Sequence, residues 1–166
     1  MANAALLVVG IVLLLVQGLF ALTPWDAFVP SLVLPMVLYM AVGEFSLARG
    51  VSLAFVLGYL TDAFAGGSMG LWTFTLVSAF LLARIAGLKL FLHGMVFQVV
   101  LTFLASCFAG LEMAGLLLVF DRRPLAVGAA LGHVVTQSLS TAALAPGVFW
   151  LIRQVPGGPP ARPEEI

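Results

Sequence analysis

Apolar runs of about 20 residues recur along this chain, and no other feature limits its fold so strongly. A helix that rises 1.5 Å per residue needs about 20 apolar residues to cross a hydrocarbon core of ~30 Å. The composition agrees, because 63% of the 166 residues are hydrophobic and only 8% are charged, against roughly a quarter charged in a soluble domain. We therefore expect an all-α polytopic membrane protein with no separate soluble domain.

The hydrophobic runs predict one transmembrane domain over residues 1–155 and a disordered cytoplasmic tail at 156–166. In the second crossing Pro30 falls in the first turn, whereas Pro35 lies deeper and is expected to kink the helix. The fifth crossing is expected to be followed by an interfacial piece up to Phe120, with one long tilted helix as the alternative. The six predicted crossings lie at about 4–22, 28–45, 49–64, 70–86, 93–111 and 125–152.

The placement of Lys and Arg predicts the orientation, since cytoplasmic loops carry an excess of these residues. No Lys or Arg precedes Arg49 and the first run is long, which indicates an uncleaved first crossing rather than a signal peptide. A cytoplasmic N-terminus puts only Arg122 and Arg123 outside. We therefore expect a multi-pass protein with both termini in the cytoplasm, whose inner side carries Arg49, Arg84, Lys89, Arg153 and Arg162.

One segment stands out from the other apolar runs, because small residues recur in it every four positions and lead to a carboxylate. On a helix this spacing puts them on one face, so a strip with almost no side chains is available for close packing. The chain then breaks at a glycine turn before the next apolar run begins. The candidate helix-packing or partner-binding residues are Gly50, Ala54, Gly58, Asp62, Gly66, Gly67 and Gly70.

Asp62 is the residue of this set that could bind a substrate or act as a catalytic acid. It lies about twelve residues after Gly50, near the outer interface, where a charge is less costly than at the bilayer centre. Capping the glycine turn or pairing with Arg122 is at least as plausible as binding a substrate. A membrane aspartyl peptidase of the lipoprotein signal peptidase type would need a second carboxylate. The other acids on that side, none of them beside a polar signature, are Asp26, Glu112 and Asp121.

The remaining polar residues do not predict a catalytic, cofactor or metal site. The two histidines, His93 and His133, lie on different segments with no Cys nearby, so a metal would lack ligands. Nucleophile elbows and phosphate-binding loops are missing from the sequence, and the seven basic residues balance the seven acidic ones, which gives no basic surface for nucleic acid. Two stripes of polar residues could line a permeation path or form hydrogen bonds between packed helices, and we favour helix packing. The stripes are Gln98-Thr102-Ser106 and His133-Gln137-Thr141.

The chain resembles the MreD family of rod shape-determining membrane proteins. The resemblance covers the whole chain in length and layout, and its specific part lies at residues 28–87. There a proline-led apolar run opens the second crossing, and G-x-x-x-D in the third is followed by a glycine turn and G-L. The residues that carry it are Pro30-Ser31-Leu32-Val33-Leu34, Gly58-Tyr59-Leu60-Thr61-Asp62 and Gly66-Gly67-Ser68-Met69-Gly70-Leu71.

This resemblance implies a non-enzymatic scaffold of the bacterial cell-wall elongation complex in the inner membrane, without a cofactor. Its implied partners are MreC, RodA with its class B penicillin-binding transpeptidase and, at the cytoplasmic face, MreB. The implied fold is a six-helix bundle similar to the substrate-binding subunits of energy-coupling-factor transporters. A small-solute-binding transporter subunit is thus the alternative, although residues 4–22 lack the AxxxA surface with which those subunits dock their partner.

Overall fold

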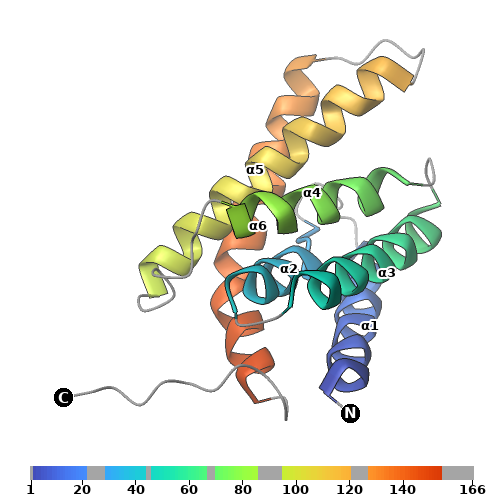
Figure 1. Cartoon of the computed structure of the whole chain (residues 1–166). Helices are drawn as coiled ribbons and strands as arrows, with labels where there is room; N and C mark the ends of the chain where they lie inside the picture. Colours follow the sequence, from blue (N-terminus) through green and yellow to red (C-terminus); the bar gives the residue numbers. More distant parts are fainter. Residues whose placement is uncertain are drawn as a thin grey trace.

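The computed structural model describes residues 2–21, 29–43, 46–66, 70–85, 95–120 and 127–154. These residues form helices and connecting turns, as expected for an all-α protein (Figure 1). The predicted tail at 156–166 lies outside the described residues. The helices are α1 (Ala2–Ala21), α2 (Val33–Val42), α3 (Leu47–Ala65), α4 (Leu71–Ile85), α5 (Met95–Phe120) and α6 (Val127–Arg153).

Two helical hairpins and a short central helix make up the arrangement. α5 and α6 lie side by side as the longest pair, and α3 and α4 form a second antiparallel pair that crosses them (Figure 1). α2 lies between the two pairs, and α1 packs beside α3. The first turn of α1 and the last turn of α6 lie toward the same end of the view (Figure 1).

Three of the described helices are long and apolar enough to cross a membrane: Leu47–Ala65, Gln98–Val119 and Leu131–Arg153. The shorter apolar helices are Ala4–Phe20, Val33–Val42 and Leu71–Ile85. The described part of the chain is therefore all-helical with three helices of membrane-spanning length, and the six predicted crossings are not confirmed.

The second predicted crossing differs most from the structure. Only Val33–Val42 is helical, which gives a rod of ~15 Å, half of the hydrocarbon thickness. The preceding Pro30 is buried in non-helical chain. Because the helix starts at Val33, Pro35 falls in its first turn, where the missing N–H has no intrahelical partner to lose. The expected kink at Pro35 was wrong for this reason.

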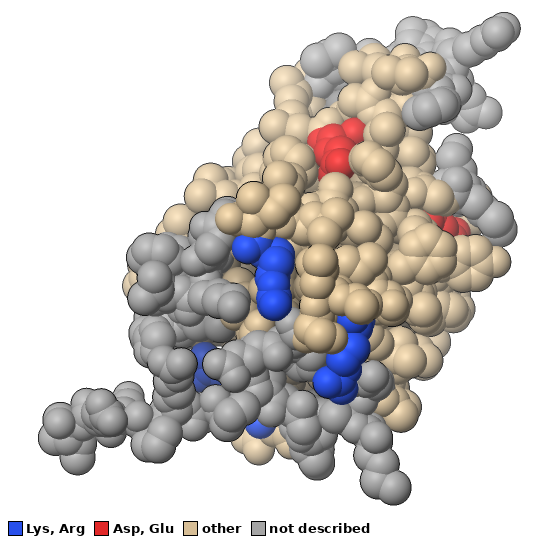
Figure 2. Space-filling view, in the orientation of Figure 1, with Lys and Arg blue, Asp and Glu red and all other residues tan. Residues whose placement is uncertain are grey.

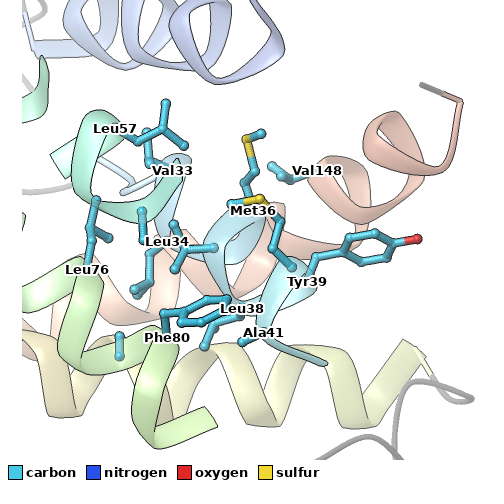
Figure 3. Close-up of a cluster of buried hydrophobic side chains, with 14 of the residues drawn as sticks. Val33, Leu34, Met36, Leu38, Tyr39, Ala41, Leu57, Leu76, Phe80 and Val148 are labelled. Atoms are coloured by element: carbon cyan, nitrogen blue, oxygen red, sulfur yellow. The ribbon is translucent and has the colours of Figure 1, made fainter. Parts of the chain in front are cut away.

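The core is built around α2, because every residue of this helix is buried. Its side chains radiate in all directions, so α2 has no polar or lipid-facing side and is enclosed by its neighbours. Tyr39 also packs on the Phe149 ring of α6, with the ring centroids 5.8 Å apart. The close-up shows the residues around it that come from α3, α4 and α6 (Figure 3): Leu57, Leu76, Phe80 and Val148.

The fifth predicted crossing is longer in the structure than expected. α5 is one continuous helix over Met95–Phe120, so the chain does not end its helix near Leu111 and continue as an interfacial piece. Glu112 does not interrupt the helix, because glutamate is a good helix former and its carboxylate finds a partner on α4. The alternative of a single long helix describes this segment.

The described charges separate along the molecule. Figure 2 shows the acidic side chains in the upper part of the view and the basic ones in the lower part. The described acids are Asp62 and Glu112, and the described cations are Arg49, Arg84 and Arg153. This separation places three of the cations expected on the inner side at one end of the bundle.

Candidate functional site

The small-residue strip of α3 faces α4. Ala54 is fully buried, and a side chain at Gly50 would overlap the ring of Phe80. At Gly58 the neighbour is main chain, because a β-carbon there would lie 2.5 Å from the α-carbon of Thr73. The strip therefore lets two helices of the same chain come into close contact, which is the intramolecular form of the packing surface.

Asp62 ends this strip and caps the N-terminus of α4. One carboxylate oxygen accepts hydrogen bonds from the N–H groups of Gly70 and Thr73, both at 3.0 Å, and from the Thr73 hydroxyl at 2.7 Å. The other accepts the N–H of Trp72 at 2.9 Å. An N-terminal helix turn has unpaired donors and a partial positive charge, so a buried carboxylate is well stabilised there.

The turn between α3 and α4 depends on glycine at two described positions. Gly66 follows the last residue of α3 with φ of +63°, and Gly70 directly precedes α4 with φ of +99°. Residues with a β-carbon rarely adopt these angles. Gly70 also supplies one of the N–H groups that Asp62 binds. Gly67, the third predicted turn residue, lies outside the described residues.

The N-terminal end of α2 is held by polar side chains from two other helices. The Ser31 N–H donates to the Thr141 hydroxyl of α6 at 2.9 Å, and the Leu32 N–H donates to the Gln17 side chain of α1 at 3.1 Å. Irregular backbone at membrane depth is tolerated only where protein groups bind its N–H and C=O groups. Gln17 and Thr141 thus have a structural task in otherwise apolar helices.

Thr141→Val is expected to lower the free energy of unfolding by about 2 kcal/mol, because the buried Ser31 N–H then loses its acceptor. Unfolding by sodium dodecyl sulfate in mixed micelles, followed by tryptophan fluorescence, measures the change. Thr136→Val is the matched control. The Thr136 hydroxyl bonds only the Gly132 carbonyl of its own helix, so its loss should stay within about 0.5 kcal/mol. Equal effects of the two variants would contradict the role given to Thr141.

The C-terminal end of α2 is held by α4 and α6. Arg84 donates to the carbonyl of Ala41 at 3.2 Å and to that of Gly43 at 3.0 Å. A cation at a helix C-terminus also interacts favourably with the helix dipole. Arg153, in the last turn of α6, interacts electrostatically with the Tyr39 hydroxyl. Both ends of the buried helix are therefore bound by side chains that lie far away in the sequence.

The polar stripe of α5 faces the interior, since Gln98, Thr102 and Ser106 are all buried. α5 and α6 run antiparallel with Gly110 against Val134, so the equal rise of the two helices brings Ser106 opposite Ser138. The α6 stripe is graded instead, from exposed His133 through Gln137 to buried Thr141. Within the part of the chain that the structure describes, three buried hydroxyls make no hydrogen bond: Thr75, Thr102 and Ser138.

Several predicted alternatives fall on residues that the structure does not describe, among them Arg122 as a partner of Asp62 and a dyad with Asp26 or Asp121. The fourth acid, Glu112, hydrogen-bonds Ser78 instead. His93 also lies outside the described residues. Among those that are described, no three His, Cys, Asp or Glu side chains gather where a metal ion could bind.

Sequence reasoning missed the importance of Gln17, Arg84 and Ser78. Each is a polar residue in an apolar run, which is a signal that a partner exists inside the bundle. The partner itself cannot be read from the sequence, because Arg84 binds carbonyls more than 40 positions away. In comparisons with protein-family models, curated proteins and solved structures, nothing matches the chain.

Proposed function

We propose that this protein is a non-enzymatic integral membrane scaffold of the bacterial cell-wall elongation complex, of the MreD type. It would bind MreC and help to couple MreB filaments to the RodA and class B penicillin-binding peptidoglycan synthase, and thus maintain cell shape. The proposal places the six-helix bundle in the inner membrane, with both termini in the cytoplasm.

The proposal is supported most by the structural roles of the residues that carry the resemblance. Gly58, Asp62 and Gly70 belong to one construction, in which α3 and α4 touch and the carboxylate caps α4. The proline-led run is likewise the start of the enclosed α2. Both patterns therefore have a physical reason to occur together in one fold. Asp62 uses both oxygens for this structural task, which favours a scaffold over an acid catalyst.

Affinity purification in mild detergent from the cells of origin tests the scaffold function. The expected result is recovery of a single-pass protein with an extracytoplasmic coiled coil, together with a polytopic glycosyltransferase and its transpeptidase. An unrelated polytopic protein with the same tag serves as the control. Recovery of an ATPase transport module in their place would overturn the assignment.

The three buried hydroxyls without a partner favour a second candidate function, the binding of a small polar solute inside the bundle. Buried hydroxyl groups are normally hydrogen-bonded, so such groups are available to a ligand or to ordered water. Native mass spectrometry of the purified protein distinguishes the two. A retained small molecule that is lost in a Thr102→Val, Ser138→Ala double variant would support the solute-binding subunit.

A further inference from the structure

Glu112 is the acid that the proposed function leaves unexplained. It lies in the membrane-length segment Gln98–Val119 and accepts a hydrogen bond from the Ser78 hydroxyl at 2.7 Å. Glu112 comes eight residues before the end of α5, about 12 Å from that end. Ser78 comes seven residues after the start of α4, about 10 Å from the N-terminus that Asp62 caps. Both positions lie well inside their apolar helices, so in a membrane we expect the carboxylate to lie at the depth of the hydrocarbon.

A single hydroxyl donor satisfies only part of the hydrogen-bonding capacity of a carboxylate at that depth. A carboxylate has two oxygens with about four acceptor sites, and acids within membrane segments are generally paired with cations. Of the three described arginines, Arg84 binds the carbonyls of α2, Arg153 interacts with Tyr39, and Arg49 lies in the first turn of α3. In Figure 2 the basic side chains lie apart from the acidic ones, with uncharged surface between them.

The surface around Glu112 allows another helix to approach. Gly115, one turn further along α5, is exposed, and a β-carbon there would meet nothing within 4 Å. Phe108, one turn earlier, and Phe74, one turn before Ser78 on α4, are exposed aromatic side chains. An acid, an exposed glycine and two aromatic rings therefore share one side of the molecule. We refer to Phe74, Ser78, Phe108, Glu112 and Gly115 as the Glu112 face.

We propose that the Glu112 face docks a single transmembrane helix of another protein, and that this helix presents a Lys or Arg to the carboxylate. Charge complementarity selects the occupant, because an acid at this depth is matched by a cation at the same depth. In the described part of this chain the basic side chains lie toward the opposite end of the molecule from the acidic ones (Figure 2), so that part of a second copy in the same orientation offers no cation to Glu112. The inference rests on the proposed scaffold function in one respect only, which is that an integral-membrane partner exists.

Energy transfer between the labelled full-length protein and model peptides in phosphatidylcholine vesicles tests the proposal. One peptide is a Leu/Ala helix of about 20 residues with a single Lys about 12 Å from one end, and the other has Leu in place of that Lys. The Lys peptide is expected to bind about tenfold more tightly, because the Leu peptide leaves the carboxylate unmatched. Equal binding of the two peptides to the wild-type protein would overturn the proposal.

Two variants separate the charge from the shape of the face. Glu112→Gln keeps an acceptor for Ser78 and should remove the preference for the Lys peptide, with an unchanged unfolding midpoint. Gly115→Leu keeps the carboxylate but fills the open position, so binding of both peptides should weaken. Gly18→Leu, equally open on α1, should change nothing. A Lys preference that persists in Glu112→Gln would also overturn the proposal.

The peptide assay and the purification fail independently. If the elongation-complex proteins are not recovered but the Lys preference depends on Glu112, the assigned complex is wrong and the docking face stands. If those proteins are recovered and the peptides bind equally, the scaffold function stands and its partner docks elsewhere.

Discussion

Gly58→Leu is expected to lower the free energy of unfolding by about 3 kcal/mol. Even the first atom of the new side chain would lie 2.5 Å from the α-carbon of Thr73 and 3.0 Å from its nitrogen. Main-chain atoms cannot rotate away as a flexible side chain can, so α3 and α4 must separate. Separation also pulls the Thr73 N–H and hydroxyl away from Asp62, which adds the loss of these hydrogen bonds.

Unfolding by sodium dodecyl sulfate in mixed micelles measures this effect, with Gly18→Leu as the matched control. Gly18 lies on the exposed side of α1 with nothing near its β-position, so leucine there should not destabilise the protein. Gly50→Ala should fall between them, because its neighbour is the Phe80 side chain, although that ring is fully buried and has little room to move. A Gly58→Leu protein as stable as the Gly18→Leu protein would mean that the two helices do not touch at this position.

Asp62→Ala is expected to lower the free energy of unfolding by about 3 kcal/mol as well, because it leaves the first turn of α4 without acceptors. Losing an N-cap costs about 1 kcal/mol, and each buried donor left unpaired adds about 1–3 kcal/mol when water cannot reach it. Gly70 and Trp72 lie closer to solvent than Thr73, so the Thr73 donors account for most of the added loss. The main-chain N–H of Trp72 donates to the carboxylate, so fluorescence in a background that lacks Trp25 and Trp150 reports this turn locally.

Asp62→Asn separates the hydrogen bonds from the charge. The amide oxygen can replace the carboxylate oxygen that accepts from Gly70 and Thr73, whereas the amide nitrogen would face the Trp72 N–H. This variant is therefore expected to be milder than Asp62→Ala and milder than Gly58→Leu. Ser52→Ala is the control within α3, because the Ser52 hydroxyl bonds only the Ala48 carbonyl of the same helix. If Asp62→Ala lowered the free energy of unfolding no more than Ser52→Ala, the carboxylate would not be stabilising the N-terminus of α4.

The sequence predicts the parts of this fold that depend on local chemistry. The spacing of Gly58 and Asp62, with glycine in the following turn, indicates close packing and a capped turn. The hydrogen bonds that Asp62 accepts span only eight to eleven positions. The bounds of α1, α3, α4 and α6 fall within a few residues of the predicted crossings. In these segments the apolar run and the helix have nearly the same length.

The sequence does not reveal α2, for a physical reason. In a membrane protein the surface that meets lipid and the surface that meets other helices are both apolar, so an apolar run does not distinguish a crossing from an enclosed helix. The bonds that show α2 to be enclosed join residues far apart, with Ser31 and Thr141 separated by 110 positions. The same limit hides the pairing of Glu112 with Ser78, which lie 34 positions apart.

The enclosure of α2 has a consequence for biosynthesis. A ribosome makes α2 long before α6, yet the hydroxyl that satisfies the Ser31 N–H belongs to α6. Until that late segment emerges, the Leu32 N–H already has its acceptor on α1 but the Ser31 N–H has none, which is unfavourable in lipid. We therefore expect the N-terminal end of α2 to reach its final hydrogen bonding only after α6 has been made.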